Sequence, residues 1–217
     1  MPKPVCHLYT PLLAACLVAS GACGAAAVTV QVRDGAGQAL SDVVVYAEAD
    51  GAAAPKTMRA ASIEQKGLKF IPLVSVVQTG SSVAFPNNDK VRHHIYSFSP
   101  AKKFDQKLYS GVAAAPQVFD KAGTVVLGCN IHDKMLAYVK VVDTPYFAKT
   151  DGAGAARIEL PAGKYVLKVW HYQAAGGATA EQALTLKGAE TVLPLSFTLT
   201  LKPAGAGADA AASGSDF

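Results

Sequence analysis

Cysteine is scarce in this chain. The 217 residues contain 4 cysteines, and three of them, Cys6, Cys16 and Cys23, fall within residues 1–27. That segment also has a basic start, an apolar stretch and a run of small residues, which together are typical of a secretory signal peptide cut near Ala27. After such a cut Cys129 is the only cysteine, which excludes an internal disulfide. A lone thiol is unusual in an exported protein unless something binds it.

The leader indicates export, and we expect a periplasmic location. A second interpretation of the leader stays open, because LAAC, ending at Cys16, resembles a lipoprotein cleavage box. Beyond the leader the sequence lacks any apolar run long enough to cross a bilayer. We therefore expect no stable membrane span.

Charge is also sparse. Charged residues make up 17% of the chain, with 20 basic and 16 acidic side chains, and no dense Lys/Arg run is present. A nucleic-acid partner is therefore not expected. The hydrophobic fraction of 51% is enough to bury one or two cores.

A sustained helical period is missing, and short strand-like segments stand in its place. They are rich in β-branched and aromatic residues and are bounded by Gly, Pro, Asn or Asp. The pattern predicts an all-β fold of antiparallel sandwiches. The low-complexity segment 203–217 is predicted to be a disordered tail. The segments are VTVQV, DVVVYAE, VSVVQTGSSVAF, HHIYSF, GTVVLG, MLAYVKVV, ARIEL, KYVLKVW and SFTLTL.

One loop gathers side chains that bind soft metals. GCNIHDKM places Cys129, His132 and Met135 between two predicted strands. A further ligand has to come from elsewhere, and His93 and His94 stand at the start of HHIYSF. Adjacent strand residues face opposite ways, so only one of the two histidines can point at the metal. Two imidazoles, a thiolate and a weak axial thioether make the trigonal arrangement of blue-copper sites.

Other chemistries each lack a residue type. Structural zinc sites usually have four Cys or His ligands, iron–sulfur clusters need more thiolates, and c-type haem needs C-x-x-C-H. A cysteine hydrolase needs a histidine from across the fold and an oxyanion hole, which nothing in the sequence marks. The remaining alternative is an inert buried cysteine beside a surface histidine and a core methionine.

The segments VQTGSSVAFPNNDKVRHHIYSF and VVLGCNIHDKMLAYVKV resemble the cupredoxins, especially the amicyanin, pseudoazurin and plastocyanin group. The resemblance implies a Greek-key sandwich over residues 56–142 with one type 1 copper. By this resemblance the ligands are His93, Cys129, His132 and Met135, with His93 favoured over His94. It also implies that His132 lies near the surface.

Two other segments, VTVQVRDGAGQALSDVVVYAE and TDGAGAARIELPAGKYVLKVW, resemble the halves of a carboxypeptidase regulatory-like (transthyretin-like) sandwich. This resemblance implies a discontinuous second sandwich over residues 28–55 and 143–202. Alternatively, residues 28–50 supply outer strands to the first domain. Trp170 is predicted to be core of the second sandwich, and His171 to be a surface or capping residue.

The expected function is a periplasmic blue copper protein that carries single electrons between redox protein partners, and not an enzyme. An oxidase or nitrite reductase would need a second set of histidines. The alternative is a non-redox copper-binding or delivery protein, or a partner-binding module, although only 3 methionines are present. Arg92, Lys102 and Lys103 are candidates for steering an acidic partner.

Overall fold

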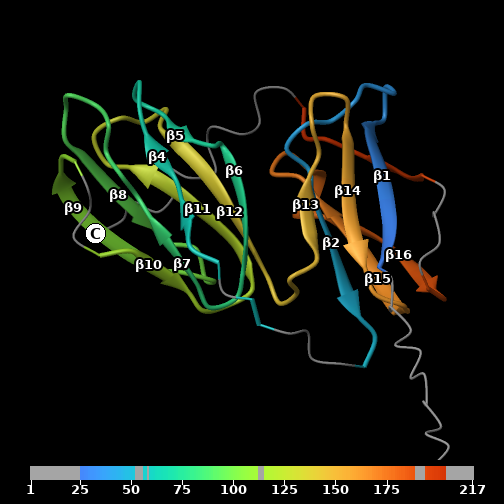
Figure 1. Cartoon of the computed structure of the whole chain (residues 1–217). Coiled ribbons are helices and arrows are strands. Elements are labelled where there is room, and N and C mark those ends of the chain that lie inside the picture. The colour runs from blue at the N-terminus through green and yellow to red at the C-terminus, as the bar shows by residue number, and fades with distance from the viewer. Residues whose placement is uncertain (1–24, 52–55, 58, 112–114, 189–193, 204–217) are drawn as a thin grey trace, which may run out of the picture.

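The protein is all-β, as predicted (Figure 1). The computed structural model describes residues 25–51, 56, 57, 59–111, 115–188 and 194–203, so the predicted tail beyond residue 203 and residues 1–24 of the predicted leader lie outside the described part. Within that part the only helical segment is a 3-10 turn at Ala175–Gly177. No helix among these residues has the length and apolarity needed to cross a membrane.

Strands β3 to β12 build a first sandwich. Its larger sheet has the order β6-β12-β11-β8-β9, and its smaller sheet has the order β10-β7-β3, with a separate β4-β5 pair. One apolar cluster, which includes Phe85, Ile95 and Phe119, fills the space between them. The strands are β3 (Ala61–Ser62), β4 (Glu64–Gln65), β5 (Phe70–Ile71), β6 (Val74–Gln78), β7 (Ser81–Ala84), β8 (His93–Ser97), β9 (Phe104–Tyr109), β10 (Gln117–Phe119), β11 (Gly123–Cys129) and β12 (Leu136–Val142).

Alternation along the sequence decides which side chains face this core. In β12, Ala137, Val139 and Val141 are buried, while Tyr138 and Lys140 between them are only half-buried. This period of two is the geometry of a strand with one face on the core. The predicted single segment VSVVQTGSSVAF is divided by a turn into β6 and β7, which belong to different sheets.

A second sandwich is built from strands that precede β3 and strands that follow β12 in the sequence. One sheet has the order β14-β1-β17 and the other β13-β2-β15-β16. Strands β1 and β2 pair with strands that follow the first sandwich in sequence, not with the first sandwich itself. Strand β1 begins one residue before the predicted cut site. The strands are β1 (Ala26–Asp34), β2 (Val44–Ala49), β13 (Phe147–Lys149), β14 (Ala155–Leu160), β15 (Gly163–Trp170), β16 (Thr179–Leu186) and β17 (Leu195–Leu199).

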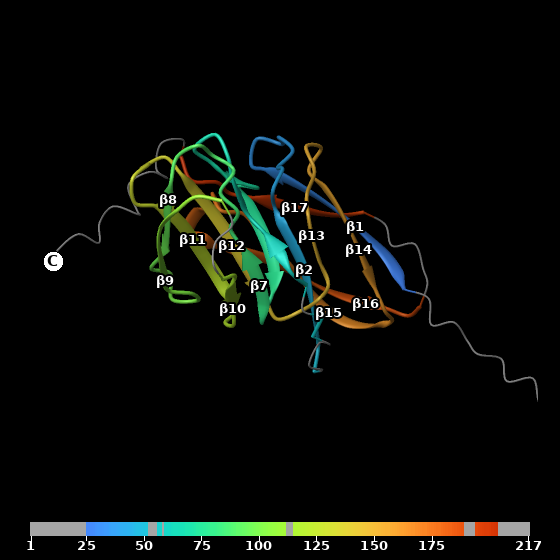
Figure 2. The ribbon, with the colours of Figure 1, turned by 60° about the vertical axis from the view of Figure 1, so that its left-hand side comes forward.

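The two sandwiches lie side by side and share a third apolar cluster (Figures 1 and 2). Val74 and Val142 enter it from the first sandwich, and Val44, Tyr46 and Trp170 enter it from the second. The prediction that Trp170 belongs to the core of the second sandwich is therefore wrong. Tyr165, Leu167 and Val169 of β15 face the core of the second sandwich, so Trp170, the next residue, leaves the opposite face of the strand, toward the first sandwich.

A lysine adds a polar link across this junction. The Nζ of Lys149 on β13 donates to Oδ1 of Asp42 at 2.6 Å and to the carbonyl of Val74 on β6 at 2.7 Å. The second of these bonds joins the two sandwiches. Apolar burial and this bond together hold the second sandwich against the sheet edge formed by β6.

Candidate metal centre

Strand pairing places the first histidine and the cysteine at the same end of the first sandwich. His93 opens β8 and Cys129 closes β11, and these two strands run antiparallel with Cys129 opposite Ile95. The loop after Cys129 returns over this end, and the N–H of Asn130 donates to the carbonyl of His94 at 3.1 Å. The ladder therefore brings together residues that are 36 positions apart in sequence.

Three predicted ligands converge at this end. One ligand atom each from His93, Cys129 and His132 lies within 4.8 Å of the other two. Sγ of Cys129 is 3.8 Å from Nδ1 of His93 and 3.6 Å from Nδ1 of His132. His93 is fully buried, Cys129 is buried, and His132 is half-buried. The half-buried ring agrees with the expectation that His132 lies near the surface.

The loop that carries His132 and Met135 is a tight turn. The N–H of His132 donates to the carbonyl of Cys129 at 3.4 Å, and the N–H of Met135 donates to the carbonyl of His132 at 2.9 Å. Met135 is 1% exposed and packs in the same apolar cluster as Cys129. Its thioether is thus placed in the core of the site's own sandwich, and its role as axial ligand stays a prediction.

His94 points away from this group. It follows His93 on β8, so its side chain leaves the opposite face of the strand. Its Nε2 contacts Oδ1 of Asp105 on the neighbouring strand β9. The structure therefore places His93, not His94, beside Cys129.

An aspartate that the sequence analysis did not single out completes the surroundings of His93. Oδ2 of Asp89 is 2.8 Å from Nε2 of His93. The same carboxylate accepts the backbone N–H of Gly67 at 2.6 Å and that of Leu68 at 3.0 Å. The spacing of four residues between Asp89 and His93 in a polar turn was the only signal in the sequence.

The backbone is distorted where it holds this carboxylate. Gly67 has φ 63° and Leu68 has φ 58°. A left-handed conformation costs a residue with a side chain roughly 1–2 kcal/mol. Two successive left-handed residues are typical of a two-residue hairpin turn, and here the N–H of Lys66 donates to the carbonyl of Lys69 to close the β4–β5 turn, whose own N–H groups bind Asp89.

These hydrogen bonds fix the charge of Asp89 and the tautomer of His93. Burial acts to raise the pKa of Asp89, but the N–H bonds from Leu68 and Gly67 and the bond to His93 outweigh it and hold the pKa below its ordinary value. An ionised carboxylate only accepts hydrogen bonds, so Nε2 of His93 carries the proton. Nδ1 is then left with its lone pair on the side of Cys129, as a metal ligand requires.

Two further features fix the backbone around the site. Buried Asn87 donates through Nδ2 to the carbonyls of Val91 and Tyr109, both at 2.9 Å, and accepts the N–H of Asp89 at 2.9 Å. Gly128, next to Cys129, has no room for a side chain, because a Cβ there would lie 2.7 Å from the ring of Tyr96. The turn before His93 and the strand before Cys129 are thus both fixed by packing.

The donor set fits copper. A thiol and two imidazole nitrogens suit copper and zinc, and a nearby thioether favours copper, because soft sulfur ligands select Cu(I). His93 already has the outer-sphere partner that metal-bound histidines commonly show. The arrangement is a mostly buried group of three donors, with one of them, His132, toward the surface.

No protein-family model matches the sequence, and no curated protein is significantly similar to it. Several solved structures resemble part of it. A copper-containing nitrite reductase from Thermus scotoductus is 24% identical over 43% of this chain, with a TM-score of 0.36, and only 24% of the reductase chain is covered. A purple cupredoxin from Nitrosopumilus maritimus is 22% identical, covering 38% of this chain and 99% of its own, with a TM-score of 0.34. Amicyanin from Paracoccus versutus is 18% identical, covering 44% of this chain and 97% of its own, with a TM-score of 0.35. Each match covers less than half of this chain, so the function proposed below is drawn from the chain's own side chains.

Proposed function

We propose that this protein is an exported, periplasmic electron carrier with one type 1 copper, which His93, Cys129, His132 and Met135 would hold. The convergence of His93, Cys129 and His132 from separate strands and a loop is the observation that carries this proposal. When bound, copper supplies a one-electron couple. Export is inferred from the predicted signal peptide. Determining the N-terminal residue of the secreted protein would test it.

The residues of the chain prepare the site for such a couple. Burial of Cys129 and His93 keeps water away from their ligand atoms. The Asp89 carboxylate sets the proton on His93 and fixes the direction of the ring. Strands β8 and β11 fix two of the three converging ligands within one ladder, so little has to rearrange between oxidation states.

A carrier, not an enzyme, is the assignment that we favour. The three converging groups and the predicted thioether would fill a type 1 coordination sphere and leave no position for a substrate. Catalytic copper proteins use further histidines, and the part of the chain that the structure describes holds a single His/Cys/acid group with metal-site spacing. Donor and acceptor are then redox proteins, with no nucleic-acid partner.

A redox titration of the copper-loaded mature protein tests this function. We expect one copper per chain and a reversible one-electron transition that can be repeated without loss of metal. A protein that binds copper and releases it on reduction would instead favour the delivery alternative. A protein that retains zinc and shows no redox transition would contradict the proposal.

A further inference from the structure

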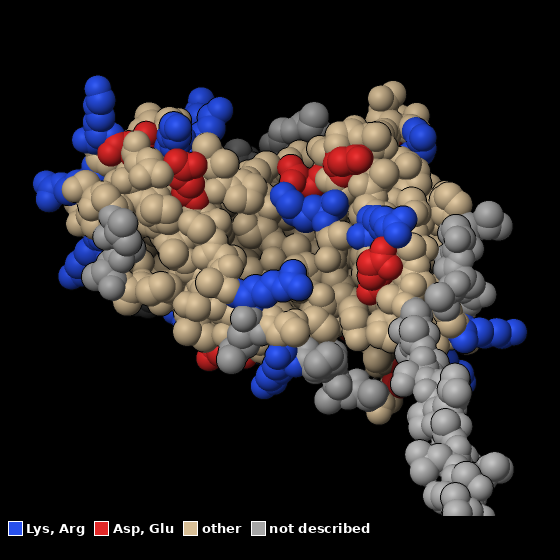
Figure 3. Space-filling model, in the orientation of Figure 1, with Lys and Arg blue, Asp and Glu red and all other residues tan. Residues whose placement is uncertain are grey.

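Basic side chains gather around the metal end of the first sandwich. They come from three loops, the β4–β5 turn, the β7–β8 turn and the loop after Cys129, and all are exposed. The first two loops are in contact, since Asp89 binds the amides of Gly67 and Leu68, and the loop after Cys129 contacts the start of β8, where the N–H of Asn130 donates to the carbonyl of His94. Figure 3 shows basic side chains projecting from this end of the molecule. We call this set the basic rim; its members are Lys66, Lys69, Lys90, Arg92 and Lys134.

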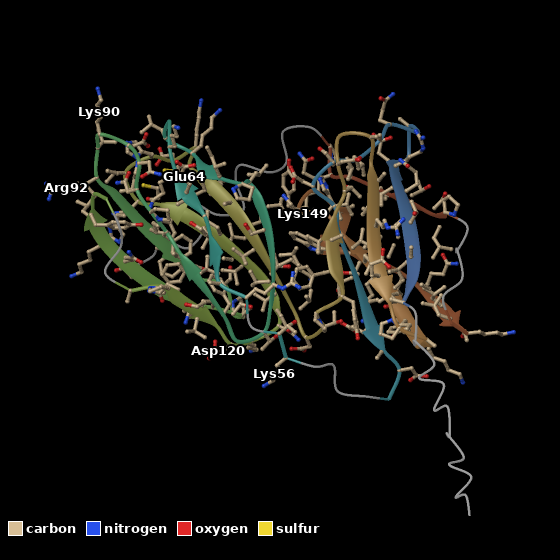
Figure 4. The ribbon with its side chains drawn as sticks, viewed as in Figure 1. Lys56, Glu64, Lys90, Arg92, Asp120 and Lys149 are labelled. Atoms are coloured by element: carbon tan, nitrogen blue, oxygen red, sulfur yellow. The ribbon has the colours of Figure 1, made fainter. Side chains whose placement is uncertain are left out.

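Acids are fewer than bases at this end, although Asp105, whose side chain is 58% exposed, contacts His94 beside the basic rim. Asp133 is exposed, and Glu64 is half-buried and accepts a hydrogen bond from Asn88 at 2.7 Å. Asp89 is occupied by His93 and by two backbone amides, and its side chain is 14% exposed. Positive charge therefore exceeds negative charge at this end. Lys90 and Arg92 point away from the ribbon into solvent (Figure 4).

Apolar side chains are interleaved with the basic rim. Leu68 is 48% exposed, Val91 47% and Ile131 49%. Each is a direct sequence neighbour of rim or site residues, and Ile131 precedes His132, the half-buried histidine of the site. The surface nearest the metal centre thus combines a small apolar area with surrounding positive charge.

The opposite end of the sandwich is a natural comparison. Lys102 and Lys103 lie beyond Ser97, the last residue of β8, whereas Arg92 directly precedes His93, its first residue. The predicted group of Arg92, Lys102 and Lys103 is therefore divided between the two ends. A strand of this length spans about 16 Å, which exceeds the Debye length of about 10 Å at moderate salt. Charges at the far end are largely screened from the metal centre.

We infer that the basic rim docks an acidic redox protein, with Leu68, Val91 and Ile131 meeting an apolar area at the centre of the contact. This inference rests on the proposed electron-carrier function. Opposite charge at the rim raises the rate of encounter, and a small, partly apolar contact lets the partners separate quickly. An acidic partner would place its redox centre near His132.

Small charged oxidants test the inference without the partner. The reduced protein is oxidised by anionic hexacyanoferrate(III) and by cationic tris(phenanthroline)cobalt(III) at low and high ionic strength. We expect the rate constant with the anion to fall severalfold as salt increases, and that with the cation to rise. The pair Lys90→Glu and Arg92→Glu should lower the low-salt rate with the anion by about tenfold, because local charge steers encounter.

The matched control is the pair Lys102→Glu and Lys103→Glu, which changes net charge equally at the far end and should alter the rate less than twofold. Lys66→Glu with Lys69→Glu, in a different loop, should reproduce the effect of the first pair. Equal effects at both ends, or a rate with the anion that does not fall as salt increases, would overturn the inference alone. Self-association that the rim variants abolish would overturn it too, since a second copy would then occupy the rim. A colourless protein without a redox transition would remove the proposed function and the docking with it.

Discussion

The ring of His93 links Asp89 to Cys129. Its Nε2 lies 2.8 Å from Oδ2 of Asp89, and its Nδ1 lies 3.8 Å from Sγ of Cys129. A carboxylate on one nitrogen makes the other nitrogen a stronger donor to a metal. The hairpin turn that holds Asp89 is therefore linked to the candidate metal centre through a single imidazole.

Asp89→Asn should raise the reduction potential of the copper protein. The anionic carboxylate stabilises Cu(II) more than Cu(I), and the neutral amide loses that preference. Removal of such a partner typically costs 10–100-fold in metal affinity, and each tenfold weakening of Cu(II) binding relative to Cu(I) raises the potential by about 59 mV. Voltammetry measures the change. The control is Asp105→Asn, which alters the partner of His94 and should leave the potential unchanged; equal shifts in both variants would contradict a specific role for Asp89.

His93→Ala should bleach the oxidised copper protein, whereas His94→Ala should largely keep its colour. The reason is direction, because His93 faces Cys129 and His94 contacts Asp105 on the other side of β8. Visible absorption of the two copper-loaded variants measures the difference. The reverse outcome would exchange the two histidines in our assignment.

His171 should make folding stability fall as the pH is lowered. It is buried and not on the surface, its Nδ1 accepts the backbone N–H of Gln173 at 3.3 Å as in the predicted capping role, and its ring packs on Tyr172 with centroids 4.5 Å apart. Burial lowers its pKa, against the opposing effects of Asp42 and of a hydrogen bond to the backbone of Ser41. The folded chain thus holds His171 neutral where the unfolded chain would bind a proton, so its contribution is present above about pH 6.5 and is lost below it.

Urea unfolding of the metal-free protein at a series of pH values measures this effect. His171→Gln should show a shallower loss of stability between about pH 7 and pH 5 than the unaltered protein, whatever its absolute stability. The comparison isolates His171, because every other side chain is the same in both proteins. Parallel pH profiles would show that His171 makes no such contribution.

Trp170→Ala should weaken the junction between the sandwiches. Trp170 is 4% exposed, and its ring centroid lies 5.2 Å from Nζ of Lys140, a residue of the first sandwich. Truncation of a buried tryptophan costs about 3–5 kcal/mol. We expect urea unfolding, followed by far-UV circular dichroism and by copper colour, to change from coincident transitions to separate ones. In Trp170→Phe the two unfolding transitions should still coincide. Separate transitions already in the unaltered protein would show that the junction contributes little to stability.

Local patterns in the sequence predicted the strands and the ligand loop. Cys129 and His132 are close in sequence, so a short loop between two strands was enough to bring them together. The alternation along HHIYSF also required that only one of His93 and His94 face the site. Which of them does so depends on the pairing of β8 with β11, which the strand pattern alone does not set.

Other features depend on contacts between distant segments. The role of Asp89 requires the left-handed turn at Gly67 and Leu68, which comes from a different hairpin. The burial of Trp170 requires the second sandwich to pack against the first, and buried His171 interacts with Ser41 and Asp42, which are distant from it in sequence. Periodicity within one strand carries no record of such packing.

The visible absorption spectrum of the oxidised, copper-loaded protein tests the central claim most directly. Coordination of Cu(II) by the thiolate of Cys129, together with His93 and His132, predicts an intense blue or green colour that Cys129→Ser abolishes. A colourless protein that loads copper, or a colour that survives Cys129→Ser, would contradict the account.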